Sequence, residues 1–381
     1  MGIEIRKYSR QFGLHACRGR MFMLNIINGG IDDFQTQLED KKLAVWGCGR
    51  VARDIYDKWR LQNKIQFFVD NDATKTVFET KYEKVPVIRL EQFIRCVDIQ
   101  NTVLLISPIY TAPEIIAQLD NIQKLNGLDC YIARMVGEYY EPGKFSFTTG
   151  PQIIPKKIHY CWFGGKEKPE KIKRCMDSWY KYCTDYEIIE WNESTYDVTK
   201  ERYMCEAYEN KQWSFVSDYA RLDIVYNEGG IYLDTDVELL KSPDELLCDE
   251  MYCGALIEYM CNTGIGFGAI ARHPLIRKMR DYYDDKSFYN DDGSLNLTQC
   301  TYYQDPVLQE YGFDLRNRYQ KIDGVVYYPS EVLNPKGMSG FAENFTDKTI
   351  SIHHGTALWL SQKDKTSLDN YGQKMKERLI K

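Results

Sequence analysis

Short apolar runs alternate with amphipathic stretches in two separate parts of this chain. In KKLAVWGCGRVARDIYDKWRLQ (residues 41–62) an apolar run and a glycine turn precede an amphipathic stretch, and IQFFVDND (65–72) is a second apolar run. The alternation continues within residues 101–133, where NTVLLIS, APEIIAQLDNIQKL and DCYIA follow one another. Because strands that alternate with helices pair in parallel, residues 41–140 are predicted to form a doubly wound, Rossmann-like sheet.

The second part of the chain repeats this alternation after a break in composition. EPGKFSFTTGPQIIP (141–155) is rich in Pro, Gly, Ser and Thr and has no helical period, which predicts a linker. Beyond it we expect strands at IHYCWFGG, YEIIEWN and IYLDTDVELL, and helices at residues 171–182 and 213–227. The predicted parts are an N-terminal extension (1–40), a Rossmann-like domain (41–140), the linker (141–155) and a second α/β domain (156–381).

Overall composition agrees with two globular domains and excludes one class of partner. The length of 381 residues exceeds that of one typical domain. A net charge of -6 and a pI of about 5.6 argue against nucleic acid as a partner, since nucleic-acid binders usually carry a basic domain. The 12 cysteines show no paired CxxC spacing, which favours free thiols in a reducing cytosol over zinc knuckles or disulfides.

The start of the chain is basic and carries one short apolar run. Residues 1–28 contain five Lys and Arg side chains. The apolar run at 21–27 is too short to span a membrane and lacks a small-residue cleavage site. We therefore expect a cytoplasmic protein, and the basic start leaves open a peripheral contact with the inner face of the membrane.

Two carboxylates, Asp234 and Asp236, directly follow the apolar run of GGIYLDTD. Residues two apart on a strand point to the same side, so both side chains can face one site if the strand stays extended. Two like charges held close are costly unless a cation lies between them, and hard oxygen ligands favour Mg²⁺ or Mn²⁺. The other interpretation of this pair is a solvated turn at the end of a strand.

An acid and a base share one face of the helix expected before that strand. Asp218 and Arg221 are three residues apart and therefore point the same way from a helix. They could hold the hydroxyls of a sugar, or they could pair with each other as a salt bridge.

Four segments carry a resemblance to a known family. The run WSFVSDYARLDIVYNEGGIYLDTDVELLKSPDEL (213–246) closely resembles the signature of DXD-containing retaining glycosyltransferases of the capsular-polysaccharide and initiating α-1,6-mannosyltransferase type, which are related to the glucosylating clostridial toxins. IPKKIHYCWFGGKEKP, CNTGIGFGAIARHP and ISIHHGTALW are similar to the family's opening strand and loop, pocket border and closing segment. The resemblance covers about residues 151–361 and implies a GT-A nucleotide-sugar-binding α/β fold for the second domain.

The resemblance assigns catalytic and metal-binding roles to individual residues. A metal ion, Mn²⁺ or Mg²⁺, would be held by Asp234, Asp236 and a histidine, for which His353 is the first candidate and His354 the reserve. The catalytic residues that the resemblance implies are Asp218, Arg221, Asp234 and Asp236.

The donor-binding residues that the resemblance implies are Trp162, Tyr232, Asn262 and Trp359. Trp162 would stack on the base of the donor, and Asn262 with Gly264 would border the donor sugar and the acceptor. A glycine-rich loop that leads to a helix start at Pro274 is the other interpretation of that border segment. The chain departs from the family in having Leu358 where a serine commonly precedes the tryptophan.

These assignments imply a metal-dependent glycosyltransferase whose donor is a nucleotide-diphosphate sugar, a UDP-sugar by preference, and which retains the anomeric configuration. Arg221 would add positive charge and fix sugar oxygens, and Asp218 would accept hydrogen bonds from donor hydroxyls. The acceptor would be a saccharide, free or lipid-linked, in the synthesis of a surface or capsular polysaccharide. Attack by the acceptor hydroxyl on the front face of the donor sugar is the expected mechanism.

The first domain carries a dinucleotide-like fingerprint. Gly47 and Gly49 lie in a turn between a predicted strand and a predicted helix, and Asp70 ends the next strand. The domain resembles the Rossmann-type domains attached to sugar-modifying enzymes. It could bind a nucleotide or a nucleotide sugar, with Arg50 and Arg53 meeting phosphates, or it could have a structural or docking role.

Two other functions stay open on the sequence alone. An NAD-dependent oxidoreductase acting on a sugar nucleotide would use the fingerprint of the first domain, but it needs a hydride-transfer site for which no residues stand out. A non-catalytic sugar-binding protein is expected where the metal ligands are broken, whereas Asp234, Asp236 and a histidine are all present here.

Overall fold

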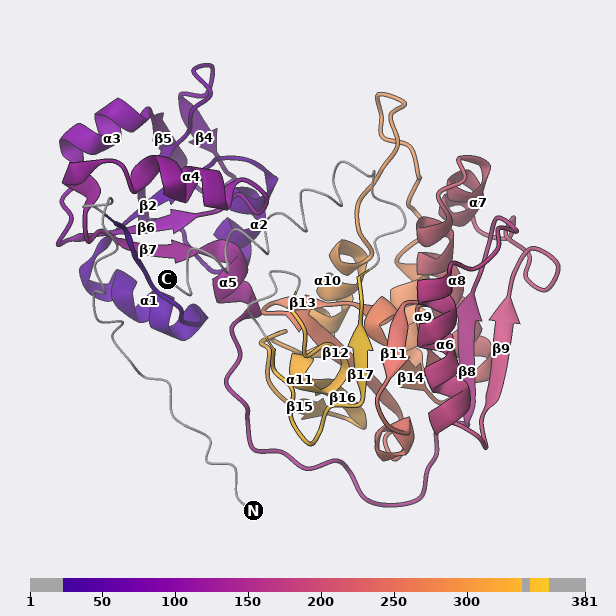
Figure 1. Cartoon of the computed structure of the whole chain (residues 1–381). Coiled ribbons are helices and arrows are strands. Elements are labelled where there is room, and N and C mark those ends of the chain that lie inside the picture. Colours follow the sequence, from indigo (N-terminus) through magenta and orange to yellow (C-terminus); the bar gives the residue numbers. More distant parts are fainter. Residues whose placement is uncertain (1–22, 338–342, 356–381) are drawn as a thin grey trace, which may run out of the picture.

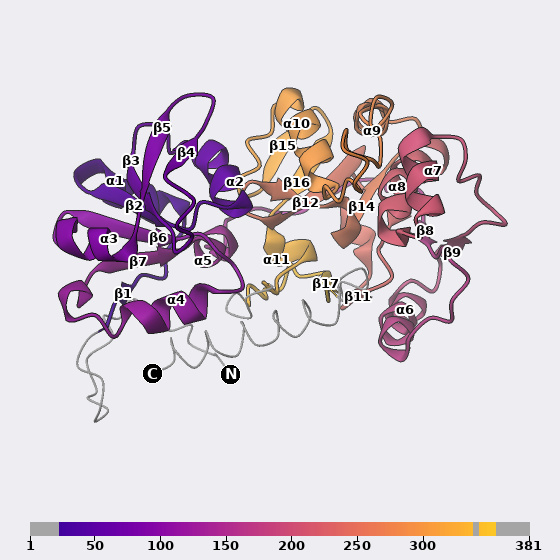
Figure 2. The ribbon, with the colours of Figure 1, turned by 90° about the horizontal axis from the view of Figure 1, so that it is seen from above.

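The computed structural model describes residues 23–337 and 343–355, which form two α/β domains side by side (Figures 1 and 2). Each domain has its own central sheet, and the segment around residues 139–156 connects them. The α/β class predicted for both domains is confirmed. The basic start of the chain, Leu358 and Trp359 lie outside the described residues.

The first domain is built on a seven-stranded sheet of order β1-β7-β6-β2-β3-β5-β4. Its strands are β1 (Asn25–Ile26), β2 (Lys42–Trp46), β3 (Ile65–Val69), β4 (Val77–Glu79), β5 (Lys84–Ile88), β6 (Thr102–Ile106) and β7 (Asp129–Ile132). All pairings are parallel except that of the edge strand β4 with β5. Every residue of β6 is buried, which explains the unbroken apolar run in the sequence of this strand.

Helices cover both faces of this sheet. They are α1 (Ile31–Asp40), α2 (Arg50–Lys58), α3 (Leu90–Cys96), α4 (Ala112–Leu119), the 3₁₀ turn η1 (Gln123–Leu125) and α5 (Ala133–Glu138). Side chains of α1, α2 and α5 share one core, and those of α3 and α4 share the other. Residues 25–40, which the sequence placed in an extension, therefore belong to this domain, since β1 pairs with β7 and Phe34 is fully buried.

The second domain is built on an eight-stranded sheet of order β15-β16-β12-β14-β10-β8-β9, with β13 beside β12. Its strands are β8 (Lys157–Cys161), β9 (Glu187–Trp191), β10 (Gly230–Tyr232), β12 (Met251–Ile257), β13 (Met260–Cys261), β14 (Phe267–Ala269), β15 (Gln320–Ile322) and β16 (Val325–Tyr328). β9, β8 and β10 are parallel neighbours, and β14 is antiparallel to β10 and β12. A separate antiparallel pair joins β11 (Val237–Leu239) to β17 (Ser351–His353).

The helices of the second domain also form two layers. They are α6 (Glu170–Tyr182), α7 (Arg202–Glu209), α8 (Trp213–Glu228), α9 (Pro274–Asp281), α10 (Thr301–Tyr311) and α11 (Ser330–Leu333), with 3₁₀ turns η2 (Pro243–Leu246) and η3 (Thr263–Ile265). α7 to α10 share one core with the sheet, and α6 and α11 share the other. Across the described ranges, no helix is both long and apolar enough to span a membrane.

Candidate active site

α8 carries Asp218 and Arg221 as a buried ion pair. Residues 215–225 of this helix are buried, because it packs between the sheet and its neighbours α7 and α9. Arg221 Nη2 lies 2.7 Å from Asp218 Oδ1. Burial raises the pKa of Asp218 to about 6, although the charge of Arg221 acts to lower it. The salt bridge that the sequence allowed is present, and it lies in the interior of the domain.

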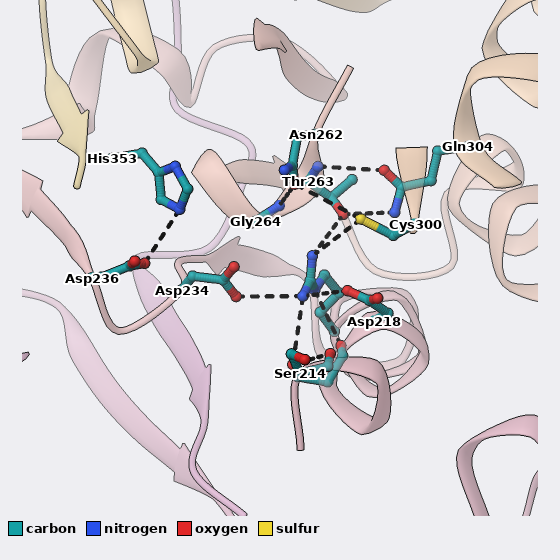
Figure 3. Close-up of polar contacts among 12 residues, drawn as sticks. Ser214, Asp218, Asp234, Asp236, Asn262, Thr263, Gly264, Cys300, Gln304 and His353 are labelled. Atoms are coloured by element: carbon teal, nitrogen blue, oxygen red, sulfur yellow. Dashed lines mark hydrogen bonds and ion pairs between the residues drawn. The ribbon is translucent and has the colours of Figure 1, made fainter. Parts of the chain in front are cut away.

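Arg221 also joins the helix to the D-x-D segment. α8 ends at Gly229, whose φ of 66° reverses the chain into β10. Arg221 Nη2 is 3.5 Å from Asp234 Oδ1, and Arg221 Nη1 donates to the Thr263 hydroxyl oxygen at 3.4 Å. Asp218, Asp234 and Thr263 therefore converge on one arginine (Figure 3).

Asp234 and Asp236 lie in a turn and not on an extended strand. β10 ends at Tyr232, and the N–H of Val237 donates to the carbonyl of Asp234 at 3.0 Å. The expected reason for their proximity was wrong, because a turn and not strand alternation brings the two carboxylates together.

β17 brings His353 to the same turn. β11 begins directly after Asp236 and pairs with β17, so that Val237 lies opposite His353. His353 Nε2 is 3.3 Å from Asp236 Oδ1. One candidate ligand atom from each of Asp234, Asp236 and His353 lies within 4.8 Å of the other two (Figure 3). We call these three residues the D-D-H triad.

The chemistry of the D-D-H triad fits a hard divalent cation. Burial raises the pKa of Asp234, and Arg221 acts to lower it. Burial lowers the pKa of His353, but the carboxylates of Asp236 and Asp234 outweigh this effect and the pKa is raised. At this spacing, both carboxylates and the imidazole can bind one cation, and the positive charge of that cation offsets the repulsion between the two carboxylates. Such an oxygen and nitrogen set suits Mn²⁺ or Mg²⁺.

His354, the reserve candidate, points to a different partner. Its Nε2 lies 2.7 Å from Glu238 Oε2, and its backbone N–H donates to the carbonyl of Asp236 at 3.0 Å. Of the two histidines, the structure brings His353 into the triad and places the side chain of His354 against Glu238 of β11.

Residues 261–264 close the cluster on the side opposite α8. The Asn262 side-chain oxygen accepts from the N–H of Gly264 at 2.7 Å and so caps η3. Gln304 of α10 donates from Nε2 to the Thr263 hydroxyl at 2.9 Å. The N–H of Asp234 donates to the carbonyl of Gly264 at 3.2 Å. Asn262 and Gly264 therefore adjoin the cluster, and the border with the donor sugar and the acceptor that the sequence predicts for them stays a prediction.

Sequence reasoning missed Thr263, Cys300 and Gln304. All three are buried, and Cys300 Sγ lies 3.9 Å from Arg221 Nη1. Gln304 is 41 residues from Thr263, so their contact depends on how α10 packs. No local pattern in the sequence could have indicated it.

Replacing Gly264 with alanine is expected to displace Asp234. A Cβ atom at position 264 would lie 2.3 Å from Asp234 Oδ2, well inside van der Waals contact. We expect Gly264→Ala to weaken Mn²⁺ binding by about tenfold or more, on the scale of losing a residue that orients a metal ligand. Calorimetric titration with Mn²⁺ measures the change, with Gly143→Ala as control because a Cβ there meets nothing closer than 4.0 Å. Equal affinity in Gly264→Ala and wild type would contradict this account.

Trp162 and Tyr232, both expected to bind the donor, have different surroundings. Trp162 is half-buried directly after β8, at the strand end where α/β sheets bind ligands, and its Nε1 donates to the carbonyl of Lys166 at 2.6 Å. Tyr232 is buried in the core, with its ring centroid 5.3 Å from Cζ of Arg221. The expected donor contact of Tyr232 is corrected, because its ring supports Arg221 from the interior.

The glycine turn of the first domain is tied to Asp70. The N–H of Cys48 donates to Asp70 Oδ2 at 3.2 Å, and Lys75 Nζ donates to the same oxygen at 3.1 Å. Burial raises the pKa of Asp70, but hydrogen bonds outweigh it and lower the pKa to about 2. Arg50 lies with Cζ 5.0 Å from the ring centroid of Tyr302 in the second domain. These contacts favour the structural or docking role over binding of a ribose and phosphates.

Comparison with protein families finds a similarity that covers most of this site. Residues 169–252 match the model of the glycosyltransferase sugar-binding region containing the DXD motif. The matched span runs from the start of α6 to β12 and includes Asp218, Arg221, Asp234 and Asp236. Residues 169–252 of the second domain are therefore similar to the DXD sugar-binding region of glycosyltransferases.

Among individual proteins, the chain is similar to inositol phosphoceramide mannosyltransferase 3 of Schizosaccharomyces pombe. The two are 30% identical over 105 residues, which cover 26% of this chain and 29% of the relative, so the chain spans under a third of that relative's length. Two solved structures are also similar to this chain. PaToxG glycosyltransferase has a TM-score of 0.28 at 21% identity, and the similarity covers 34% of this chain and 60% of the PaToxG chain. A glycosyltransferase involved in glycosylation of the major capsid of PBCV-1 has a TM-score of 0.32 at 15% identity, and the similarity covers 57% of this chain and 98% of that structure's chain.

Proposed function

We propose that this protein is a glycosyltransferase that moves a sugar from a nucleotide-diphosphate sugar to a saccharide acceptor with retention of the anomeric configuration. A UDP-sugar is the favoured donor, and the acceptor is a growing surface or capsular polysaccharide, free or lipid-linked. The reaction depends on Mn²⁺ or Mg²⁺. It takes place on the cytoplasmic side, with the basic start of the chain giving a peripheral contact with the membrane.

One observation carries this proposal. The D-D-H triad, whose ligand atoms lie within 4.8 Å of one another, adjoins the buried pair of Asp218 and Arg221 inside the DXD sugar-binding region. A cation site beside fixed polar groups for a sugar is the combination that transfer from a nucleotide sugar requires.

Each part of the cluster has a separate task in this reaction. Asp234, Asp236 and His353 would hold the cation, which when bound stabilises negative charge on the departing phosphate as a Lewis acid. Arg221 keeps Asp234 in place and adds positive charge beside it. Asp218, held by Arg221, accepts hydrogen bonds from donor hydroxyls and orients the anomeric carbon.

The acceptor hydroxyl attacks the anomeric carbon on the face that the phosphate leaves. Its oxygen forms the new glycosidic bond while the bond to the phosphate breaks, and the phosphate oxygen takes the hydroxyl proton. This course needs no nucleophile from the enzyme. A sugar trapped covalently on an enzyme carboxylate would contradict it.

The direct test is release of nucleoside diphosphate from a panel of UDP-sugars and GDP-sugars, with Mn²⁺ and with EDTA. We expect release from one donor class with Mn²⁺, faster with an oligosaccharide acceptor and absent with EDTA. No release from any donor with Mn²⁺, or equal release with EDTA, contradicts the proposal.

Replacing Trp162 with alanine is expected to weaken nucleotide binding. Loss of one stacked ring costs about 1–3 kcal/mol, by analogy with bases stacked on aromatic side chains. Trp162 is half-buried, so its removal leaves the core largely intact. Titration of Trp162→Ala with UDP and GDP in Mn²⁺ measures the loss, and Trp162→Phe, which keeps a ring, should retain most of the affinity. Loss of folding in place of weaker binding would show that the ring acts in packing.

A further inference from the structure

Helix α2 of the first domain lies against α10 of the second (Figure 2). Arg50, Asp54 and Lys58 are spaced four residues apart and so share one face of α2. Arg50 and Lys58 both lie over the ring of Tyr302, and the Tyr302 hydroxyl donates to Asp54. This face of α2, which begins directly after the glycine turn, is occupied by the second domain.

Lys58 and Asp305 form the innermost pair of this contact. Lys58 Nζ lies 3.1 Å from Asp305 Oδ2 and also donates to the carbonyl of Tyr259 at 3.1 Å. Asp305 is only 4% exposed. An isolated carboxylate at such a depth is costly, so the ammonium group of Lys58 supplies most of its compensation.

The other oxygen of Asp305 holds the segment that borders the candidate active site. Asp305 Oδ1 accepts from the N–H of Cys261 at 3.0 Å. The preceding residue of α10, Gln304, holds Thr263. Two adjacent side chains of one helix thus fix residues 261–264, against which Asp234 and Arg221 are placed.

We propose that Lys58 of the first domain is a positioning residue for the active site of the second domain. Through Asp305 it holds residues 261–264, and through them the position of Asp234. This inference rests on the proposed function for its catalytic meaning, whereas the contacts themselves do not depend on it. According to this inference, the first domain stabilises the position of active-site residues that belong to the second domain.

Amide hydrogen exchange of the full chain tests the inference without any ligand. In Lys58→Met, Asp305 loses its partner, and we expect exchange in a peptide covering residues 260–267 to accelerate by about tenfold or more. Asp32→Asn is the matched control, since it removes another ion pair between the domains, Asp32 Oδ2 with Arg316 Nη2 at 2.8 Å, and leaves Lys58 and Asp305 unchanged. Exchange in the control should equal that of wild type.

The double variant Lys58→Met with Asp305→Asn separates positioning from general loss of structure. It replaces the ion pair by neutral groups, and the introduced amide oxygen can still accept from the N–H of Cys261. We expect its exchange at residues 260–267 to return to within about threefold of wild type, even if Lys58→Met alone folds poorly. Wild-type exchange in a folded Lys58→Met, or no recovery in the double variant, overturns the inference.

A titration of the same proteins with Mn²⁺ and UDP or GDP links the contact to the site. Lys58→Met should bind Mn²⁺ and nucleotide at least about fivefold more weakly, and Asp32→Asn should match wild type. Failure of wild type to bind either ligand would count against the proposed function alone, because the exchange result stands without it. Binding of Lys58→Met equal to that of wild type would overturn the link to Asp234.

Discussion

Asp236→Asn is expected to lower the rate of sugar transfer by at least about 100-fold, on the scale of losing one group that stabilises transition-state charge. Asp236 is the centre of the D-D-H triad, since its Oδ1 lies 3.3 Å from His353 Nε2 and its turn also carries Asp234. The amide keeps the shape of the side chain but removes one negative charge from the cation site. Donor turnover in Mn²⁺ measures the effect.

Glu238→Gln is the control for this prediction. Glu238 lies two residues further on and pairs with His354, outside the triad. This variant loses the same charge nearby and should keep most of the turnover. Unchanged turnover in Asp236→Asn, or equal losses in the two variants, would refute the metal assignment.

Arg221→Met is expected to damage both stability and activity. The guanidinium is 3% exposed and balances the carboxylate of Asp218 at 2.7 Å. Removing one partner of a buried ion pair leaves the other uncompensated, which costs about 3–5 kcal/mol of unfolding free energy. Asp234 also loses the positive charge of Arg221, which holds it in place, so turnover should fall below detection. Chemical denaturation and donor turnover measure the two effects.

The double variant Arg221→Met with Asp218→Asn distinguishes folding from function. Neutralising both members of the ion pair removes the uncompensated charge and should restore most of the lost stability. Activity should stay absent, because the groups that orient Asp234 and the donor sugar are missing. Recovery of turnover together with stability would mean that this pair serves the fold alone.

The α/β architecture could be predicted from sequence because its strands and helices have local apolar and amphipathic patterns. β6 is buried along its whole length, and α8 begins and ends where its sequence pattern indicates. The D-x-D pair and its histidine could be singled out because each lies in a short, continuous sequence motif that resembles the family. The family match over residues 169–252 supports the class of the site, while the finer capsular or α-1,6 type stays a prediction.

The remaining features depend on tertiary packing and leave no local signal. Gln304 reaches Thr263 only because α10 packs beside η3, and Lys58 reaches Asp305 across a domain boundary. β1 has only two residues and shows no period, so the assignment of residues 25–40 to an extension missed it. The resemblance put His353 ahead of His354, whereas the contact that brings His353 to Asp236 depends on the register of β17 with β11, which the sequence does not display.

Calorimetric titration of wild type with UDP and GDP, each with and without Mn²⁺, tests whether the D-D-H triad forms a metal-dependent nucleotide site. We expect one nucleotide to bind when Mn²⁺ is present and this binding to disappear with EDTA. Binding of neither nucleotide under any condition, with binding of NAD in their place, would contradict the account and move the functional site to the first domain.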